Sequence, residues 1–171
     1  TAWLFTATSP EEIFGGYASI DPGRDLVVAV DAGLERVHTL GLIPGLIIGD
    51  MDSVGPELLQ LYPHTTQLRH PAEKNETDTE LAMLWCLQAG VGEMVICNSL
   101  EGRFDHSLAL LQNLDFLRAR GLSARIESVR QQLWFLEPET LISGCRGCLL
   151  SLLAWGSAAE FTCSEGLQYP L

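Results

Sequence analysis

Two carboxylates stand one residue apart at the end of an apolar run: Asp50 and Asp52, in the segment LIIGDMDS. In an extended chain the side chains of residues i and i+2 point the same way. The two carboxylates could then share Mg²⁺, which prefers a few carboxylates together with water and substrate phosphate oxygens. A solvated Asx-turn, with Ser53 capping the next helix, explains the same residues without a metal. The segment by itself leaves both interpretations open.

Other acidic segments also follow, or lead into, apolar runs. Asp31 comes directly after VVAV, and the segment GRFDH, which contains Asp105, follows MVIC. The segment ETDTE, which contains Asp78, opens the helix that leads into MVIC. In open parallel sheets, ligands bind beyond the carboxyl ends of the strands. We therefore expect these acids to converge on one edge of one sheet, and Asp31 and GRFDH favour the metal interpretation.

The residues around Asp78 have a structural and a functional interpretation. Thr77 and Glu80 form a T-x-x-E capping box, which explains both residues without a ligand. Asp78 is not needed by that box and is free to face a ligand. Lys74, just upstream, is either a solvated loop lysine or a point charge for a phosphate.

The segment GRFDH is ambiguous in a similar way. Gly102 allows close backbone approach, and Arg103 before a helix start can fork onto a phosphate, aided by the helix N-terminus. Asp105 could instead be the N-cap of that helix. His106, on a first helical turn, is interpreted as a hydrogen-bonded structural histidine.

The elements that must position these residues alternate along the chain. Strands are predicted within 2–7, 25–33, 45–53, 66–70 and 93–99, and helices within 10–19, 34–41, 56–62, 77–90 and 105–121. Strands that alternate with helices predict βαβ units and a largely parallel sheet. The helix at 77–90 is predicted to bury Leu81, Leu84, Trp85 and Gln88, and the helix at 105–121 to bury Leu110, Leu111, Leu114 and Leu117.

The pattern changes after Gly121. The segments SARIESV, QQLWFLEP, GCLLSLLAW and AEFTCSEGLQYPL are strand-like and lack long helical partners. We therefore predict an α/β domain over 1–121, followed by an all-β, sandwich-like domain over 122–171. The second domain ends in mid-pattern at Leu171 and is expected to be incomplete.

The composition of the chain limits which functions and which cellular compartments are expected. The chain carries 22 acidic and 10 basic residues, a net charge of −12, which argues against general nucleic-acid binding. It has no apolar run of about 18 residues, so no membrane helix is predicted, and no secretion signal is visible. The 5 cysteines, an odd number in apolar stretches, suggest reduced thiols in a cytoplasm. The lone CRGC at 145–148 lacks the further ligands of a zinc site.

Taken together, the motifs resemble one enzyme family. VDAG, PGLIIGDMDS, K-x-x-T-D-x-E at 74–80, GRFDH and GLQYPL occur in the order and with the spacing of the thiamine pyrophosphokinase family. The resemblance extends over nearly the whole chain, and GDMDS and GRFDH carry most of it. It implies an α/β nucleotide-binding domain followed by a β-sandwich, Mg²⁺ as cofactor, ATP and thiamine as substrates, and a homodimer.

The resemblance also implies a reaction and site residues. The β,γ-pyrophosphoryl group of ATP would pass to the hydroxyl of thiamine, giving thiamine diphosphate and AMP. By motif, the family's acidic metal-binding cluster matches Asp31, Asp50, Asp52, Asp78 and Asp105. Positions near the nucleotide match Ser53, Lys74, Thr77, Arg103 and His106. Catalytic roles fall to Asp78, Asp105 and Arg103, and either Asp78 or Asp105 would take the hydroxyl proton.

The chain departs from the family pattern in two places. Asn75 stands where the family commonly has an acid after the lysine, and the chain stops before a further segment that helps to hold thiamine. Three other functions stay open at this point. They are a haloacid-dehalogenase-like phosphatase with Asp50 as nucleophile, a pyrophosphokinase for another hydroxymethyl heterocycle, and a non-catalytic Mg²⁺–nucleotide sensor.

Overall fold

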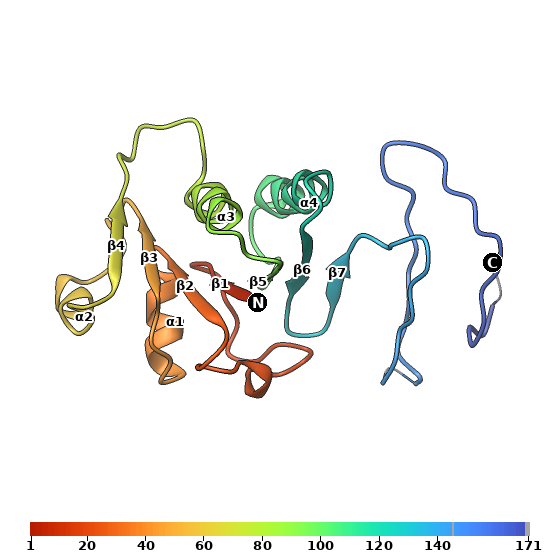
Figure 1. Cartoon of the computed structure of the whole chain (residues 1–171), viewed down its shortest axis with the longest axis horizontal. Helices are drawn as coiled ribbons and strands as arrows, with labels where there is room; N and C mark the ends of the chain where they lie inside the picture. Colours follow the sequence, from red (N-terminus) through yellow and green to blue (C-terminus); the bar gives the residue numbers. More distant parts are fainter. Residues whose placement is uncertain (145, 170–171) are drawn as a thin grey trace. The chain divides into compact units, whose positions relative to one another are not determined.

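A mostly parallel sheet dominates the computed structural model, which describes residues 1–144 and 146–169. The 7-stranded sheet has the order β4-β3-β2-β1-β5-β6-β7 (Figure 1). Its strands are β1 (Ala2–Phe5), β2 (Leu26–Val30), β3 (Leu46–Gly49), β4 (Thr66–Arg69), β5 (Glu93–Cys97), β6 (Ser123–Glu127) and β7 (Gln132–Trp134). Strands β1 to β6 are parallel, and β7 pairs antiparallel with β6. The predicted α/β fold is confirmed.

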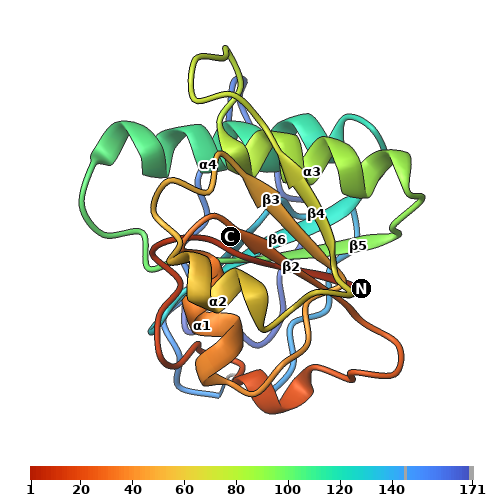
Figure 2. The same ribbon diagram turned by 90° about the vertical axis from the view of Figure 1, so that its left-hand side faces the viewer.

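Helices cover both faces of this sheet. They are α1 (Gly33–Thr39), α2 (Pro56–Gln60), α3 (Asp78–Gln88) and α4 (Phe104–Arg118). Figure 2 shows α3 and α4 on one face, and α1 and α2 on the other. The strands LVVAV, LIIG and EMVIC are apolar on both faces, as central parallel strands usually are. One core therefore lies under α3 and α4, and a second lies under α1.

The buried face of α3 differs from the predicted one. Ala82, Met83 and Cys86 are the buried residues of this helix, whereas Gln88 is exposed. Leu81 and Trp85 are partly buried at the margin of the core. The predicted stripe is wrong because this helix is apolar on more than one side, and packing on the sheet buries the neighbouring face. For α4 the prediction largely holds, since Leu110, Leu114 and Leu117 are buried.

The segment predicted as a helix at 10–19 forms only a short 3₁₀ turn at Tyr17–Ser19. Pro10 and two glycines interrupt it, and Gly16 adopts φ 71°, which is left-handed. The segment packs on the sheet instead. Phe14 N–H donates to Ser128 O (2.9 Å), and the Tyr17 hydroxyl donates to Pro10 O (2.8 Å).

Strands β6 and β7 extend the sheet past the domain boundary predicted after Gly121. By contacts the chain divides into two units, Thr1–Leu136 and Glu137–Leu171. Ile126 of β6 is fully buried in the same core as α3 and α4. The segments SARIESV and QQLWFLEP therefore contribute strands to the first unit, because β6 pairs in register along β5.

The second unit does not show the predicted all-β domain. Among its described residues, 137–144 and 146–169, no helix or strand is assigned. Large apolar side chains there are strongly exposed, including Leu141 and Leu149, each at 94%, and Leu153 at 90%. Cys145 of the CRGC segment lies outside the described residues, and Cys148 is a free, exposed thiol. No helix within the described ranges is long and apolar enough to cross a membrane.

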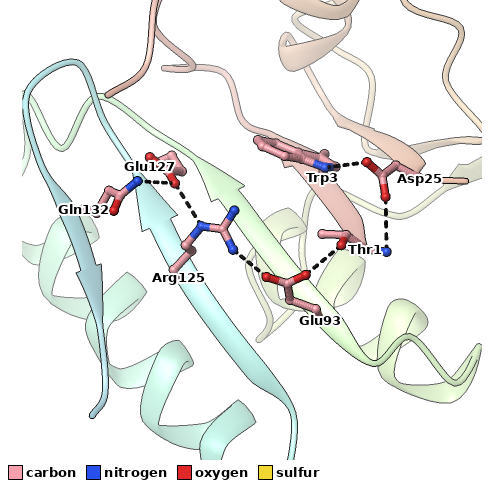
Figure 3. Close-up of polar contacts among 7 residues, drawn as sticks. All are labelled: Thr1, Trp3, Asp25, Glu93, Arg125, Glu127 and Gln132. Atoms are coloured by element: carbon pink, nitrogen blue, oxygen red, sulfur yellow. Dashed lines mark hydrogen bonds and ion pairs between the residues drawn. The ribbon is translucent and has the colours of Figure 1, made fainter. Parts of the chain in front are cut away.

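A polar network runs across β1, β5, β6 and β7 (Figure 3). Arg125 donates to Glu93 (2.5 Å) and to Glu127 (2.8 Å), and Gln132 also donates to Glu127 (2.8 Å). The Glu127 side chain is only 2% exposed. This network joins β7 and β6 to the centre of the sheet, in agreement with a first unit that ends at Leu136.

Candidate functional site

The carboxyl ends of the parallel strands meet at one edge of the sheet. The residues that follow β1, β2, β3 and β5 there are Thr6, Asp31, Asp50 and Asn98. Strand β1 lies between β2 and β5. The chain builds the sheet from β1 through β2 and β3 to β4 in one direction, and then crosses back to place β5 on the other side of β1. Such a change of direction opens a crevice in which α/β proteins bind ligands.

Asp31 is held tightly at this edge. Its backbone is left-handed, with φ 47°, and its N–H donates to Ile48 O (3.0 Å). Its Oδ1 accepts a hydrogen bond from Met51 N–H (3.4 Å). A Cβ at Gly49 would lie 1.7 Å from this oxygen, so only glycine leaves room for the carboxylate beside β3.

Asp78, on the first turn of α3, lies next to Asp31. Burial, followed by the negative charge of Asp78, raises the pKa of Asp31 to about 6. Asp50 adds to this repulsion. Three carboxylates from separate chain segments therefore interact, and a bound cation would relieve their repulsion.

Lys74 partly balances this charge. Its Nζ lies 2.9 Å from Asp78 Oδ1, and both side chains are largely buried, at 12% and 18% exposed. The hydrogen bond to Asp78, together with the charges of Asp50 and Asp31, raises the pKa of Lys74 above its ordinary value. Lys74 also donates to Pro71 O (3.0 Å), so the ammonium is fixed at the site.

Asp50 and Asp52 do not form the extended pair that their spacing predicts. Met51 between them is left-handed, with φ 62°, and is buried. Asp52 N–H donates to Asp50 Oδ1 (3.1 Å), an Asx-turn that also lowers the pKa of Asp50. The turn leaves Asp52 and Ser53 exposed, and the N-cap of α2 is Gly55, not Ser53.

The segment GRFDH begins α4 at the same edge. Arg103 is the N-cap residue, so Asp105 does not take that position. The Arg103 guanidinium instead pairs with the Asp105 carboxylate (2.5 Å), and the two side chains are 70% and 62% exposed. This pairing lowers the pKa of Asp105. His106 is exposed, next to this ion pair.

The capping box at α3 is confirmed. Glu80 N–H donates to Thr77 Oγ1 (3.2 Å), and Thr77 N–H donates to Glu80 Oε2 (2.7 Å). Both residues therefore have a structural task that orients the first turn of α3. That turn carries Asp78.

The acidic site fits Mg²⁺ in its chemistry. Within residues 1–144 and 146–169, no three His, Cys, Asp or Glu side chains are close enough to form a complete metal-binding group. Mg²⁺ needs fewer, because one or two carboxylates usually suffice alongside waters and substrate phosphates. Asp78 Oδ1 is buried against the Lys74 ammonium, and burial together with neighbouring negative charge raises the pKa of Asp31 beside it. These are carboxylates that a cation would satisfy.

The structure thus brings together part of the predicted set. Asp31, Asp50, Asp78 and Lys74 interact with one another, whereas Asp105 and Arg103 form a separate, exposed pair. Sequence reasoning missed Asn98 and Thr6, which occupy the same edge between these groups. Their position directly after apolar strands is the signal that could have found them.

Comparisons with known proteins agree with this architecture. A family model described as "Thiamin pyrophosphokinase, catalytic domain" matches residues 19–126. The thiamine pyrophosphokinase of Bacillus subtilis (strain 168) is 28% identical over 110 residues, which are 63% of this chain and 51% of that protein. The chain therefore spans about half the length of this curated relative.

Solved structures are similar over most of the chain. A thiamin pyrophosphokinase family protein from Enterococcus faecalis is 31% identical with a TM-score of 0.61, covering 73% of this chain and 60% of that one. The thiamine pyrophosphokinase from Bacillus subtilis, 24% identical, shares the fold with a TM-score of 0.62, covering 74% and 60%. Because the family model matches well over half of the 171 residues, the chain belongs to the thiamin pyrophosphokinase family.

Proposed function

We propose that this chain carries the ATP-binding catalytic part of a thiamine pyrophosphokinase. It would transfer the β,γ-pyrophosphoryl group of ATP to the hydroxyl of thiamine, with thiamine diphosphate and AMP as products. The observation that carries the proposal is the cluster of Asp31, Asp50 and Asp78 with Lys74 at the carboxyl edge of the sheet. Family membership supports the choice of reaction.

The proposed site divides its tasks by chemistry. Asp31, Asp50 and Asp78 would hold Mg²⁺, with Asp52 and Asp105 as further candidate ligands. When bound, Mg²⁺ neutralises phosphate charge and orients the phosphate oxygens. Lys74 and Arg103 would contact the triphosphate, because ammonium and guanidinium groups bind phosphate by charge-assisted hydrogen bonds. Ser53, Thr77 and His106 are proposed to line the nucleotide side.

In phosphoryl-type transfer the protein contributes mainly by positioning the reactants and neutralising charge. The thiamine hydroxyl oxygen would attack the β-phosphorus in line. The bond from the β-phosphorus to the oxygen shared with the α-phosphate would break, and that oxygen leaves with AMP. The hydroxyl proton would pass to Asp78 or Asp105.

The test is AMP formation from ATP, Mg²⁺ and thiamine by the wild-type chain and by Asp50→Asn. We expect the asparagine variant to lose AMP release by about 100-fold or more, because a carboxylate that holds the metal becomes a neutral amide. Its circular dichroism spectrum should match wild type. Asp115→Asn, far along α4 in an exposed ion pair, is the matched control and should keep full activity.

Several outcomes would contradict the proposal. Wild-type turnover in Asp50→Asn would refute the metal role of Asp50. Release of phosphate from a simple phosphate ester without AMP would indicate a phosphatase. AMP formation only with another hydroxymethyl heterocycle would change the acceptor, and nucleotide binding without AMP from any acceptor would indicate a sensor. A homodimer and a cytoplasmic location are also proposed, and size-exclusion chromatography with light scattering tests the former.

A further inference from the structure

The loop at 98–103 joins β5 to α4 and starts with Asn98, which neither the motifs nor the proposed chemistry uses. Its side-chain amide makes two hydrogen bonds. Nδ2 donates to Thr6 Oγ1 (3.0 Å), and Oδ1 accepts from Leu100 N–H (2.8 Å). Thr6 is itself buried, and its hydroxyl donates to Cys97 O (2.9 Å). Asn98 therefore connects the loop to the carboxyl end of β1.

Leu100 needs such support because its backbone is left-handed, with φ 59°. L-residues with a side chain other than Asn or Asp rarely adopt this conformation, and it persists only where the surroundings enforce it. The bond from Leu100 N–H to Asn98 satisfies the amide in this conformation. Loss of the acceptor would release the loop toward ordinary backbone angles.

The rest of the loop is attached to its neighbours at several points. Ser99 N–H donates to Thr8 O (2.9 Å), and the Ser128 hydroxyl donates to Ser99 O (2.9 Å). The Ser107 hydroxyl, in α4, donates to Leu100 O (3.4 Å). The backbone of the loop is thus fixed to the ends of β1 and β6 and to the first turns of α4.

Arg103 depends on this backbone for its location. It stands at the end of the loop, after Gly102 with φ 89°, and it pairs with Asp105 only two residues away. Its guanidinium is 70% exposed, so packing does not hold the side chain. The path of residues 98–102 therefore decides where Arg103 meets a ligand.

We propose that Asn98 is a positioning residue, which shapes the loop at 98–103 so that Arg103 reaches the triphosphate of ATP. This rests on the proposed function only in that Arg103 is taken to contact ATP. Asn98 itself contacts neither ATP nor thiamine in the proposed arrangement. It acts through Leu100 and the backbone that leads to Arg103.

A double-mutant cycle on the full chain tests the proposal. The wild type, Asn98→Ala, Arg103→Ala and the double variant are titrated with Mg²⁺ and a non-hydrolysable ATP analogue by calorimetry. We expect Asn98→Ala to weaken binding by about five- to tenfold, and the double variant to bind no more weakly than Arg103→Ala alone. At saturating ATP, kcat for AMP formation in Asn98→Ala should stay within about twofold of wild type while KM rises.

Substitutions at Thr6 test the same hydrogen bond without changing Asn98. Thr6→Val removes the acceptor for Nδ2 and should reproduce the loss of affinity, whereas Thr6→Ser keeps the oxygen and should restore it. Thr65→Val is the matched control, since its hydroxyl donates to Pro44 O at the opposite edge of the sheet (2.9 Å). That variant should bind the analogue like wild type.

Two results would overturn the proposal. One is unchanged affinity in both Asn98→Ala and Thr6→Val. The other is a double variant whose fold-loss of affinity for the ATP analogue equals the product of the fold-losses in the two single variants. Asn98 would then act independently of Arg103. Failure of this proposal can be told apart from failure of the proposed function. If the wild type binds the ATP analogue but makes no AMP, the proposed function fails, and the four binding affinities still test the role of Asn98. A wild type that does not bind the analogue contradicts both.

Discussion

Asp31 shows most directly how the site opposes the ionisation of its own residues. It is partly buried, and Asp78 and Asp50 both place negative charge near it. Asp31 and Met51 are both left-handed; aspartate tolerates this conformation, whereas Met51 adds local strain after β3. Backbone strain of this kind gathers at binding and catalytic sites, where the surrounding structure must enforce it.

This environment predicts a pH dependence of stability. The pKa of Asp31 is about 6 in the folded protein, against an ordinary value of 3.8. Between about pH 4 and pH 6 the folded protein holds more protons than the unfolded chain, so stability from this group falls as pH rises. We expect Asp31→Asn to match wild type near pH 4 and to be more stable near pH 7 by urea denaturation.

The control for this prediction is Asp52→Asn, because Asp52 is exposed. Added Mg²⁺ at neutral pH should raise the urea midpoint of wild type and have less effect on Asp31→Asn, since the carboxylate is proposed to hold the ion. A pH profile of Asp31→Asn parallel to wild type would contradict the assignment.

Residue types alone could not decide how GDMDS is used. The spacing of Asp50 and Asp52 allowed a shared cation or an Asx-turn, and the structure shows the turn. Yet Asp50 still joins Asp31 and Asp78 electrostatically. The Asx-turn is therefore confirmed, whereas the shared cation stays a prediction: one oxygen of Asp50 accepts the Asp52 amide, and the charge of Asp50 still acts on Asp31.

At the scale of elements, β6 and β7 are joined to the sheet by a buried carboxylate. Glu127 is paired by Arg125 and Gln132, and its Oε2 accepts no hydrogen bond. Arg125 also lies over the ring of Trp3 (5.8 Å) and pairs with Glu93. The guanidinium therefore offsets a charge that burial would otherwise make unfavourable.

Removal of Arg125 should be costly. Arg125→Met leaves Glu127, with a side chain only 2% exposed, without its cation. We expect a loss of about 3–5 kcal/mol in the free energy of unfolding, measured by urea denaturation. The double variant Arg125→Met/Glu127→Gln should regain much of this, because the buried charge is gone.

Arg118→Met is the comparison for this experiment. Arg118 pairs with Asp115 on the surface of α4, where the side chains are 52% and 36% exposed. A pair of this kind contributes about 0–1 kcal/mol, so the loss should be small. Equal losses for Arg125→Met and Arg118→Met would show that Glu127 is not destabilised by the missing cation.

Helix α3 illustrates what an element's sequence leaves open. Its start was predictable, because Thr77 and Glu80 form a capping box that the structure confirms. Its buried face was not, because Leu81, Ala82, Met83 and Trp85 allow more than one apolar stripe. Packing on the sheet buries the face with Ala82, Met83 and Cys86.

At the scale of the whole molecule, the chain falls into a first unit with all its assigned helices and strands and a second unit, Glu137–Leu171. The first unit has a core on each face of its sheet. The described part of the second unit exposes Leu141, Leu149 and Leu153. The first unit therefore has the buried apolar surface that cooperative folding requires, and the described part of the second unit does not.

Two shortened chains separate the observed boundary from the predicted one. A chain ending at Leu136 should unfold in one cooperative transition by circular dichroism, with a midpoint close to that of the full chain. A chain ending at Gly121 lacks β6 and β7, and with them the buried Ile126 and the pairing along β5. It should lose the cooperative transition, and equal melting curves for the two chains would contradict this boundary.

The sequence by itself determined the alternation of strands and helices, the parallel sheet and the placement of acids after strands. These properties depend on apolar runs, glycines and caps, which act over a few neighbouring residues. Only the tertiary structure decided that Asp31, Asp50 and Asp78 meet around Lys74 while Asp105 pairs with Arg103. It also decided that β6 and β7 belong to the first sheet. The reason is that strand order and loop path, which no local pattern encodes, determine which strand ends become neighbours.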